Sequence, residues 1–235
     1  MNTSLTDERC IEVGNMGDVH GLGPLPDSTL VVAADDGLYH ITPEGTPLQI
    51  IAQGKKEGVQ IRDAIVCALS RSDNDTPSNI IFYTYYDKLF TKTISLQLPF
   101  TSGKPITISL GHNVIYAANP IENCIYVLSL DGSVRTKHGR SGRGGAGELS
   151  FPHAAATDAH EYLLVCDNRN HRLQVMTHEG EWRLLKSDSE MKRPRVAIVV
   201  DRKVFVGGGS ESCYISVFDI HSQIEFNERS ITPMF

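Results

Sequence analysis

Residues 162–180 have the sequence YLLVCDNRNHRLQVMTHEG, and this stretch contains the pattern that decides the fold. An apolar run is followed by a short polar break, a second apolar run and a turn that ends at Gly180. Apolar, β-branched runs separated by polar breaks are typical of strands, and an acid-Gly turn supplies the positive φ at which a hairpin reverses. The stretch therefore predicts an antiparallel hairpin.

The same layout recurs outward from this stretch. Turns ending in Gly45 and Gly132 repeat the turn at Gly180, and the spacings are 87 and 48 residues, so one degenerate copy is expected between the first two. We place the five copies at residues 30–45, 80–96, 114–132, 162–180 and 204–222. Further strands are expected before several copies, at 106–110, 154–157 and 196–200, and after the fourth copy at 182–185.

Four strands per unit, at about 47 residues per unit, is the pattern of a β-propeller. We therefore predict an all-β fold, a β-propeller of five four-stranded antiparallel blades, in a single domain over residues 1–235. Residues 10–13 and 224–227 are candidate outer strands: one of them closes the ring in a five-bladed protein, and both together imply a partial sixth blade. Tyr83, Tyr85 and Tyr86 are expected in a loop between two strands of the second copy.

Two segments around the fourth copy also carry a family resemblance. GELSFPHAAATD at 147–158 and LVCDNRNHRLQV at 164–175, with the following Gly180, resemble the NHL repeat. Ala154 stands where that family usually has glycine, and the other copies share only the strand pattern. The residues that match the signature, to which we assign structural roles, are Pro152, Asp167, Asn170, His171, Arg172 and Gly180. Asp167 and Arg172 are expected to pair across the reversal and hold its loop.

The resemblance is greatest to the NHL domains at the C-termini of tripartite-motif proteins. It implies a recognition module that selects targets for an attached RING-type ubiquitin ligase. The Cys/His-rich RING and B-box regions are absent from this sequence, so we expect the chain itself not to be an enzyme. The function expected is binding of a protein partner, of single-stranded RNA, or of both.

Charge is segregated along the chain, whose formal net charge is −6. Residues 135–203 carry +4, whereas residues 1–134 carry −7 and residues 204–235 carry −3. In a meander, the loop between the second and third strands of a blade opens on the same face as the connection to the next blade. We therefore expect one basic loop face that holds an acidic partner segment or RNA phosphates. Its candidate binding residues are Arg135, Lys137, His138, Arg140, Arg143, His153 and Arg169.

Three other interpretations stay open. The segment RTKHGRSGRGG at 135–145 is also what a solvated, flexible loop looks like. A second interpretation is a metal-dependent lyase or hydrolase that uses the propeller channel. His20 and His153, at the starts of inner strands, are the histidines that could converge there. A plain scaffold propeller is the third. The sequence has no catalytic motif, and we predict no catalytic residues, no metal site, no cofactor and no small-molecule substrate.

The five cysteines form no CxxC pair, and four of them lie in or beside apolar runs, as buried reduced thiols do. The segment MNTSLTDERC at 1–10 lacks the pattern of a secretory signal, and no apolar run approaches the ~18 residues of a membrane-spanning helix. We expect a cytoplasmic protein that does not bind membranes.

Overall fold

The computed structural model describes most of the chain in eight segments. They are residues 16–70, 78–98, 107–157, 162–177, 179–187, 191–200, 203–208 and 214–219. The chain divides into two compact units, 1–101 and 102–235, and each is described by itself. Within the described segments every regular element is a strand, apart from one three-residue 3-10 turn. None of these segments forms a helix of the length and apolarity needed to cross a membrane.

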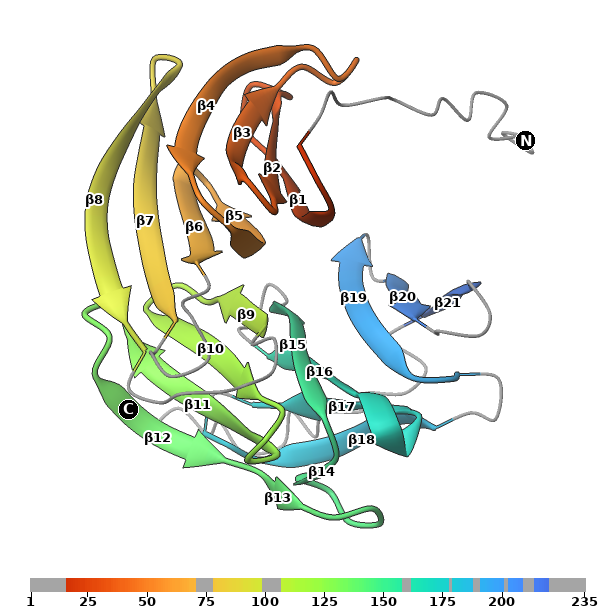
Figure 1. The fold of residues 1–235 in the computed structure, drawn as a ribbon. Coiled ribbons are helices and arrows are strands. Elements are labelled where there is room, and N and C mark those ends of the chain that lie inside the picture. Colours follow the sequence, from red (N-terminus) through yellow and green to blue (C-terminus); the bar gives the residue numbers. More distant parts are fainter. Residues whose placement is uncertain are drawn as a thin grey trace, which may run out of the picture. The chain divides into compact units, whose positions relative to one another are not determined.

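Five antiparallel sheets have their strands in chain order, as propeller blades do, and this confirms the predicted all-β fold (Figure 1). Four of these sheets have four strands, and the described part of the fifth has three. The candidate outer strands at 10–13 and 224–227 lie outside the described residues.

Unit 1 contains the first two blades. Blade 1 consists of β1 (Val19–Pro24), β2 (Leu30–Ala34), β3 (Gly37–Ile41) and β4 (Pro47–Gln53). Blade 2 consists of β5 (Lys56–Arg62), β6 (Ile65–Ser70), β7 (Asn79–Tyr86) and β8 (Leu89–Gln97).

The placement predicted for the second copy was wrong by one strand. Residues 80–96 form the last two strands of blade 2, not its second and third. Tyr83 and Tyr85 are buried within β7 and do not lie in a loop, and only Tyr86 is exposed. The hairpin reverses at Asp87 and Lys88, with φ of 48° and 62°. Because this turn has no glycine, the sequence pattern did not mark it.

Unit 2 contains the other three blades. Blade 3 consists of β9 (Thr107–Leu110), β10 (Val114–Asn119), β11 (Cys124–Ser129) and β12 (Val134–His138). Blade 4 consists of β15 (Pro152–Thr157), β16 (Leu163–Asp167), β17 (Arg172–Met176) and β18 (Trp182–Ser187), with the 3-10 turn at Asn168–Asn170. Blade 5 consists of β19 (Pro194–Val200), β20 (Lys203–Gly208) and β21 (Tyr214–Asp219).

The predicted acid-Gly turns are present in three blades. Gly45, Gly132 and Gly180 have φ of 88°, 87° and 86°. Each amide donates a hydrogen bond to the carbonyl three residues earlier, so the three turns share one local structure. At Gly180 a side chain is also excluded by space, because a Cβ would lie 2.1 Å from the His138 ring.

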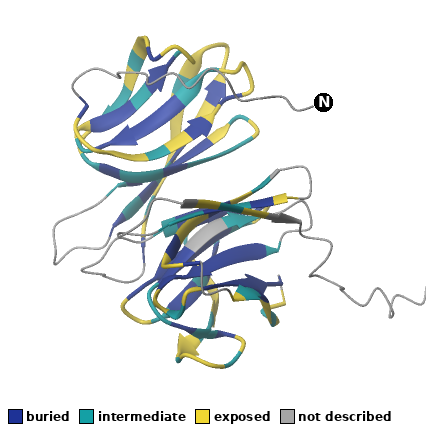
Figure 2. Cartoon of the chain, turned by 90° about the vertical axis from the view of Figure 1, so that its right-hand side faces the viewer, coloured by how far each residue is buried: buried dark blue, intermediate teal, exposed yellow. Residues whose placement is uncertain are grey.

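The core lies between neighbouring blades. Alternate residues of β16 face opposite ways: Leu163 and Val165 pack toward blade 3, whereas Leu164 and Cys166 pack toward blade 5. Both faces of the strand are therefore buried, which explains its unbroken apolar run (Figure 2). Cys67, Cys124 and Cys166 are buried free thiols, as expected, and burial raises the pKa of each.

Candidate interaction surface

Loops of blades 3, 4 and 5 meet at one face of unit 2. The Arg169 amide donates to the Ser150 carbonyl at 3.0 Å, and Asn170 Nδ2 donates to the Gly142 carbonyl at 2.8 Å. The 3-10 turn of blade 4 therefore contacts the connection from blade 3 to blade 4, as the meander geometry predicted. We call this surface the loop face, and it comprises residues 120–123, 139–151, 168–171 and 191–193.

The connection from blade 3 to blade 4 has a defined structure. It contains a short parallel ribbon of β13 (Arg140–Ser141) and β14 (Glu148–Leu149), which projects beyond β12 in Figure 1. Its ends are joined by hydrogen bonds from the Arg140 amide to the Gly147 carbonyl, and from the Gly142 amide to the Leu149 carbonyl. Most of residues 135–145 are exposed, as the interpretation of a solvated segment expects, but these contacts give residues 140–149 a defined structure.

A buried ion pair holds this connection from below. Arg172 Nε donates to Asp167 Oδ2 at 2.7 Å, and the two residues are 5% and 0% exposed. The remaining Arg172 nitrogens donate to the carbonyls of Gly144, Gly145 and Glu148 at 3.2, 3.0 and 2.7 Å. The predicted pairing of Asp167 with Arg172 is therefore present, and the guanidinium hydrogen bonds with three carbonyls of the connection.

Gln174 and Ser150 complete the environment of the pair. Gln174 Nε2 donates to the Glu148 carbonyl at 2.8 Å and to Asp167 Oδ2 at 3.1 Å. The Ser150 amide donates to Asp167 Oδ1 at 2.7 Å. Both oxygens of the buried carboxylate thus accept hydrogen bonds, which is the condition under which a buried charge is tolerated.

The backbone amides of the glycine-rich segment bind the carboxylate of Glu148, which belongs to the same connection. The amides of Gly144 and Gly145 both donate to Glu148 Oε2 at 3.0 Å, and Arg140 donates to Oε1 at 3.2 Å. These hydrogen bonds lower the pKa of Glu148 to about 2. A Cβ at Gly142 would lie 2.5 Å from the same carboxyl group, so glycine is needed there for space. The amides of Gly144 and Gly145 are therefore engaged by a side chain of the same connection.

Three of the predicted binding residues are engaged within the chain. Arg135 Nε donates to Ser129 Oγ at 2.7 Å beside the turn between β11 and β12, away from the 3-10 turn of blade 4. Lys137 forms an ion pair with Glu122, and its Nζ lies 5.3 Å from the centre of the Tyr126 ring. His138 hydrogen bonds with Thr136 Oγ1 at 2.8 Å and is half-buried, and burial lowers its pKa.

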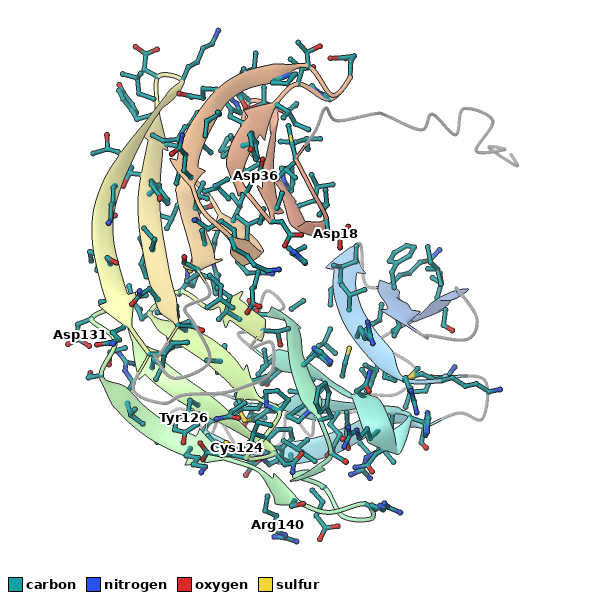
Figure 3. All side chains as sticks on the ribbon, viewed as in Figure 1. Asp18, Asp36, Cys124, Tyr126, Asp131 and Arg140 are labelled. Atoms are coloured by element: carbon teal, nitrogen blue, oxygen red, sulfur yellow. The ribbon has the colours of Figure 1, made fainter. Side chains whose placement is uncertain are left out.

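Three predicted arginines are exposed on the loop face. Arg140 extends away from β13 in Figure 3 and pairs with Glu148. Arg143 has no ion pair or hydrogen bond with any residue that the structure describes. Arg169 places its guanidinium 4.8 Å from the centre of the Phe151 ring. Arg140, Arg143 and Arg169 therefore all belong to the loop face, and their role in binding stays a prediction.

His153 is placed differently from the expectation of an exposed binding group. It is only 9% exposed, and its Nε2 makes no hydrogen bond within the described part of the chain. Its ring lies edge-on to Phe151 at 5.7 Å. Burial first, and then the charge of Arg195, lower the pKa of His153 to about 4. The side chain is therefore neutral at pH 7.

The sequence-based site omitted the segment before blade 5, although it contains Lys192, Arg193 and Arg195. The Arg193 amide donates to His171 Nδ1 at 3.1 Å, and Asn168 Nδ2 donates to the Pro194 carbonyl at 3.0 Å. These bonds join the segment to the 3-10 turn of blade 4. Its position before an inner strand, equivalent to that of residues 139–150, is a signal from which the sequence could have identified it.

The remaining signature residues shape the loop face. Asn170 donates to Asp167 Oδ2 at 2.8 Å as well as to Gly142. His171 adopts the left-handed conformation, with φ of 56°, which ends the 3-10 turn. Pro152 is buried at the start of β15. These contacts are those of residues that build the blade.

A second polar cluster lies in unit 1 and contains a histidine next to a hydroxyl. Thr29 Oγ1 lies 2.7 Å from His40 Nε2 and 2.5 Å from Asp27 Oδ1, and Tyr85 donates to Asp27 Oδ2 at 2.6 Å. Gln49 Nε2 lies 3.3 Å from His40 Nδ1 and can only donate to it. His40 therefore carries its hydrogen on Nε2 and donates to Thr29, which donates to Asp27. A histidine in this arrangement does not accept a proton from the threonine, so the cluster is structural.

Among the described residues, no three His, Cys, Asp or Glu side chains are grouped so that they could hold a metal ion. His20, the other candidate of the channel hypothesis, hydrogen bonds with Asp35 Oδ1 at 2.8 Å within unit 1. That the chain is not an enzyme stays a prediction.

No protein-family model and no curated protein matches the chain. Solved structures do match. A streptogramin B lyase is 16% identical, with a TM-score of 0.62 over 89% of this chain and 70% of the lyase. A protein of the nidogen/laminin complex is 14% identical, with a TM-score of 0.67 over 90% of this chain and 80% of that one. BamB from Moraxella catarrhalis is 12% identical, with a TM-score of 0.51 over 84% of this chain and 56% of BamB. At these identities the likeness shows the fold alone, which is the β-propeller.

Proposed function

We propose that this chain is a non-catalytic recognition module that binds a protein partner through the loop face. The observation that carries the proposal is the buried Asp167–Arg172 pair, whose hydrogen bonds hold residues 142–150 in one conformation. Because a buried ion pair adds little to stability compared with apolar packing, we infer that this pair serves to specify one structure of the connection. A connection ordered before binding loses less conformational entropy when a partner docks.

The exposed groups on this rigid connection suit protein recognition. Arginine is enriched at protein interfaces because its planar guanidinium both packs and hydrogen bonds. Two of the solved structures with a similar fold come from a nidogen/laminin complex and from BamB, and they support a binding or scaffold role by analogy of fold.

Two finer proposals follow from the sequence. The resemblance of residues 147–180 to NHL repeats supports a partner that is a target of an associated ubiquitin ligase. The three buried cysteines, which remain free thiols, support a reducing compartment such as the cytosol.

Affinity capture from cell lysate with matched variants tests the proposal. The test variant is Arg140→Ala/Arg143→Ala, and the control is Lys92→Ala/Lys203→Ala, which removes the same charge from exposed positions on β8 and β20. We expect wild type and control to retain a common set of proteins that the test variant loses, in RNase-treated lysate as well. Equal capture by all three chains would rule the loop face out. Loss of capture on RNase treatment would instead favour an RNA ligand.

A further inference from the structure

The Phe151 ring, at the end of the connection, packs against the side chains of Arg169 and His153. Its backbone has a positive φ of 57°, fixed by a hydrogen bond from its amide to Asn123 Oδ1 at 2.8 Å. One face of its ring is covered by the Arg169 guanidinium, and its edge meets the His153 ring. The ring therefore sets the positions of a cation and of an imidazole from two different segments of blade 4.

The second observation is the unpaired nitrogen of His153. Buried polar atoms in folded proteins nearly always have a hydrogen-bond partner, and each exception calls for an explanation. His153 Nε2 is buried and has no partner among the described residues. Arg195 lies at the start of β19, which packs beside the strand β15 that carries His153, and its charge acts on the same ring. A hydrogen-bond acceptor with negative charge would satisfy the nitrogen and favour the nearby guanidinium.

Both arginines of the cluster are available to a ligand. Arg169 and Arg195 are exposed, and within the described segments neither forms an ion pair with an acidic side chain. This separates them from Arg140 and Lys137, which pair with Glu148 and Glu122. Arg169 and Arg195 are therefore exposed cations, like Arg143, that no acidic side chain of the described segments neutralises.

We propose that His153, Arg169 and Arg195 form a subsite for the carboxylate of an acidic side chain in the partner protein. The inference rests on the proposed function and names the chemistry of the partner. A guanidinium matches a carboxylate in a two-bond, planar geometry, and a neutral imidazole supplies one further N–H donor.

A protein segment fits this face better than a nucleic acid does. Glu122 and Glu148 lie among the basic residues, and their charges would repel a continuous phosphate backbone. Single-stranded nucleic acids also rely on aromatic faces for base stacking, and the Phe151 face is covered by Arg169. A single carboxylate needs neither a continuous basic track nor a free ring.

Fluorescence anisotropy with a fluorescein-labelled hexaglutamate peptide tests the subsite, with hexaglutamine as the matched neutral probe. Arg169→Ala/Arg195→Ala is expected to weaken hexaglutamate binding at least about tenfold, since charged hydrogen bonds are lost. Lys92→Ala/Lys203→Ala is expected to bind as wild type does. Equal affinity for the two peptides, or equal affinity of wild type and the arginine variant, would overturn the proposal.

Two histidine variants separate ligand binding from a packing role. His153→Gln keeps an N–H donor and His153→Phe does not, so the glutamine variant is expected to bind hexaglutamate more tightly. In wild type, the NMR signals of the His153 ring are expected to shift when the peptide is added. If the two variants bind equally and the ring signals do not move, His153 is not part of the subsite.

The outcomes also distinguish the two proposals. If protein capture depends on Arg140 and Arg143 while hexaglutamate does not bind, the recognition module stands and the carboxylate subsite is wrong. If an oligouridine RNA binds more tightly than hexaglutamate and the Arg169/Arg195 variant loses it, the subsite is for phosphate and our assignment is overturned.

Discussion

Two polar networks, one in each unit, use an aspartate to hold a loop. They differ in whether the aspartate is buried and in which groups it holds. In unit 1, Asp27 accepts from Thr29 and from Tyr85, so a loop of blade 1 is tied to β7 of blade 2. In unit 2, Asp167 is wholly buried, and Arg172 extends from it to three carbonyls of the connection. The first network is a short chain of hydroxyl and imidazole groups, whereas the second is an ion pair beneath a projecting segment.

The difference shows how a fold of similar blades produces one specialised face. In the unit 1 network, Thr29 and Tyr85 donate to the exposed Asp27 carboxylate, so its negative charge is engaged by groups of blades 1 and 2. The Asp167–Arg172 pair uses its donors on backbone carbonyls, so the side chains of the connection, including Arg143, remain free to point outward. Of the two networks, only the Asp167–Arg172 network combines a held backbone with guanidinium groups that stay free at the surface.

The largest effect is expected from Arg172→Ala. It leaves the Asp167 carboxylate buried without its cation, and the free energy of unfolding should fall by about 3–5 kcal/mol. Urea denaturation measures the loss, and hydrogen exchange at the amides of Arg140 and Gly142 reports whether the connection opens. Asp167→Leu/Arg172→Met replaces both charges with apolar groups and is the control. If the single variant costs no more than this double variant, the pair does not act as described.

His153→Phe is expected to change the pH dependence of stability by up to about 3 kcal/mol. The pKa of His153 is about 4 in the folded chain, whereas the ordinary pKa of a histidine is 6.5. Between these values the unfolded chain binds a proton that the folded chain does not, so wild type loses stability as pH falls from 6.5 to 4. The phenylalanine variant lacks this loss. Parallel stability curves for the two chains would show that the ring is accessible to protons.

In unit 1, Tyr85→Phe removes one hydrogen bond to Asp27 and is expected to cost about 1 kcal/mol, because the exposed carboxylate keeps its water. Burial raises the pKa of Asp27, but the hydrogen bonds from Thr29 and Tyr85 outweigh it and lower the pKa to about 2. The stability from this group is present above pH 3.8 and is lost as pH falls through 2. In the variant the pKa of folded Asp27 lies closer to 3.8, so the loss should be smaller and complete at a higher pH, which acid titration of the unfolding midpoint measures. If Tyr85→Phe and wild type lose stability over the same pH range, the hydrogen bond from Tyr85 does not hold Asp27 as described.

The smallest and most local effect is expected from Glu148→Gln. The amide side chain accepts hydrogen bonds without a full charge, so the contacts with Gly144, Gly145 and Arg140 weaken. Exchange of the Gly144 and Gly145 amides should become faster while the urea midpoint stays where it is. A shift of the midpoint equal to that of Arg172→Ala would mean that the connection and the blade unfold as one unit.

Sequence reasoning succeeded where the cause was local. The strands on either side of Asp167–Arg172 and the turn at Gly180 were placed within a residue or two, because side-chain alternation and turn geometry act between near neighbours. It failed in blade 2, where the turn at Asp87 and Lys88 has positive φ without glycine. The loop face was also predicted in outline, since a meander dictates which loops share a side.

The amino-acid sequence by itself determined the strands outside blade 2, the acid-Gly hairpin turns and the sector of positive charge, because each depends on residue type and short spacing. Only the tertiary structure decided which cations are available. Lys137 is paired because Glu122, in the loop between β10 and β11, lies beside it in the folded blade. His153 is buried because blades pack on both faces of its strand. Arg169 and Arg195 belong to one cluster because blades 4 and 5 are neighbours. Such pairings join residues far apart in the chain, and no local pattern records them.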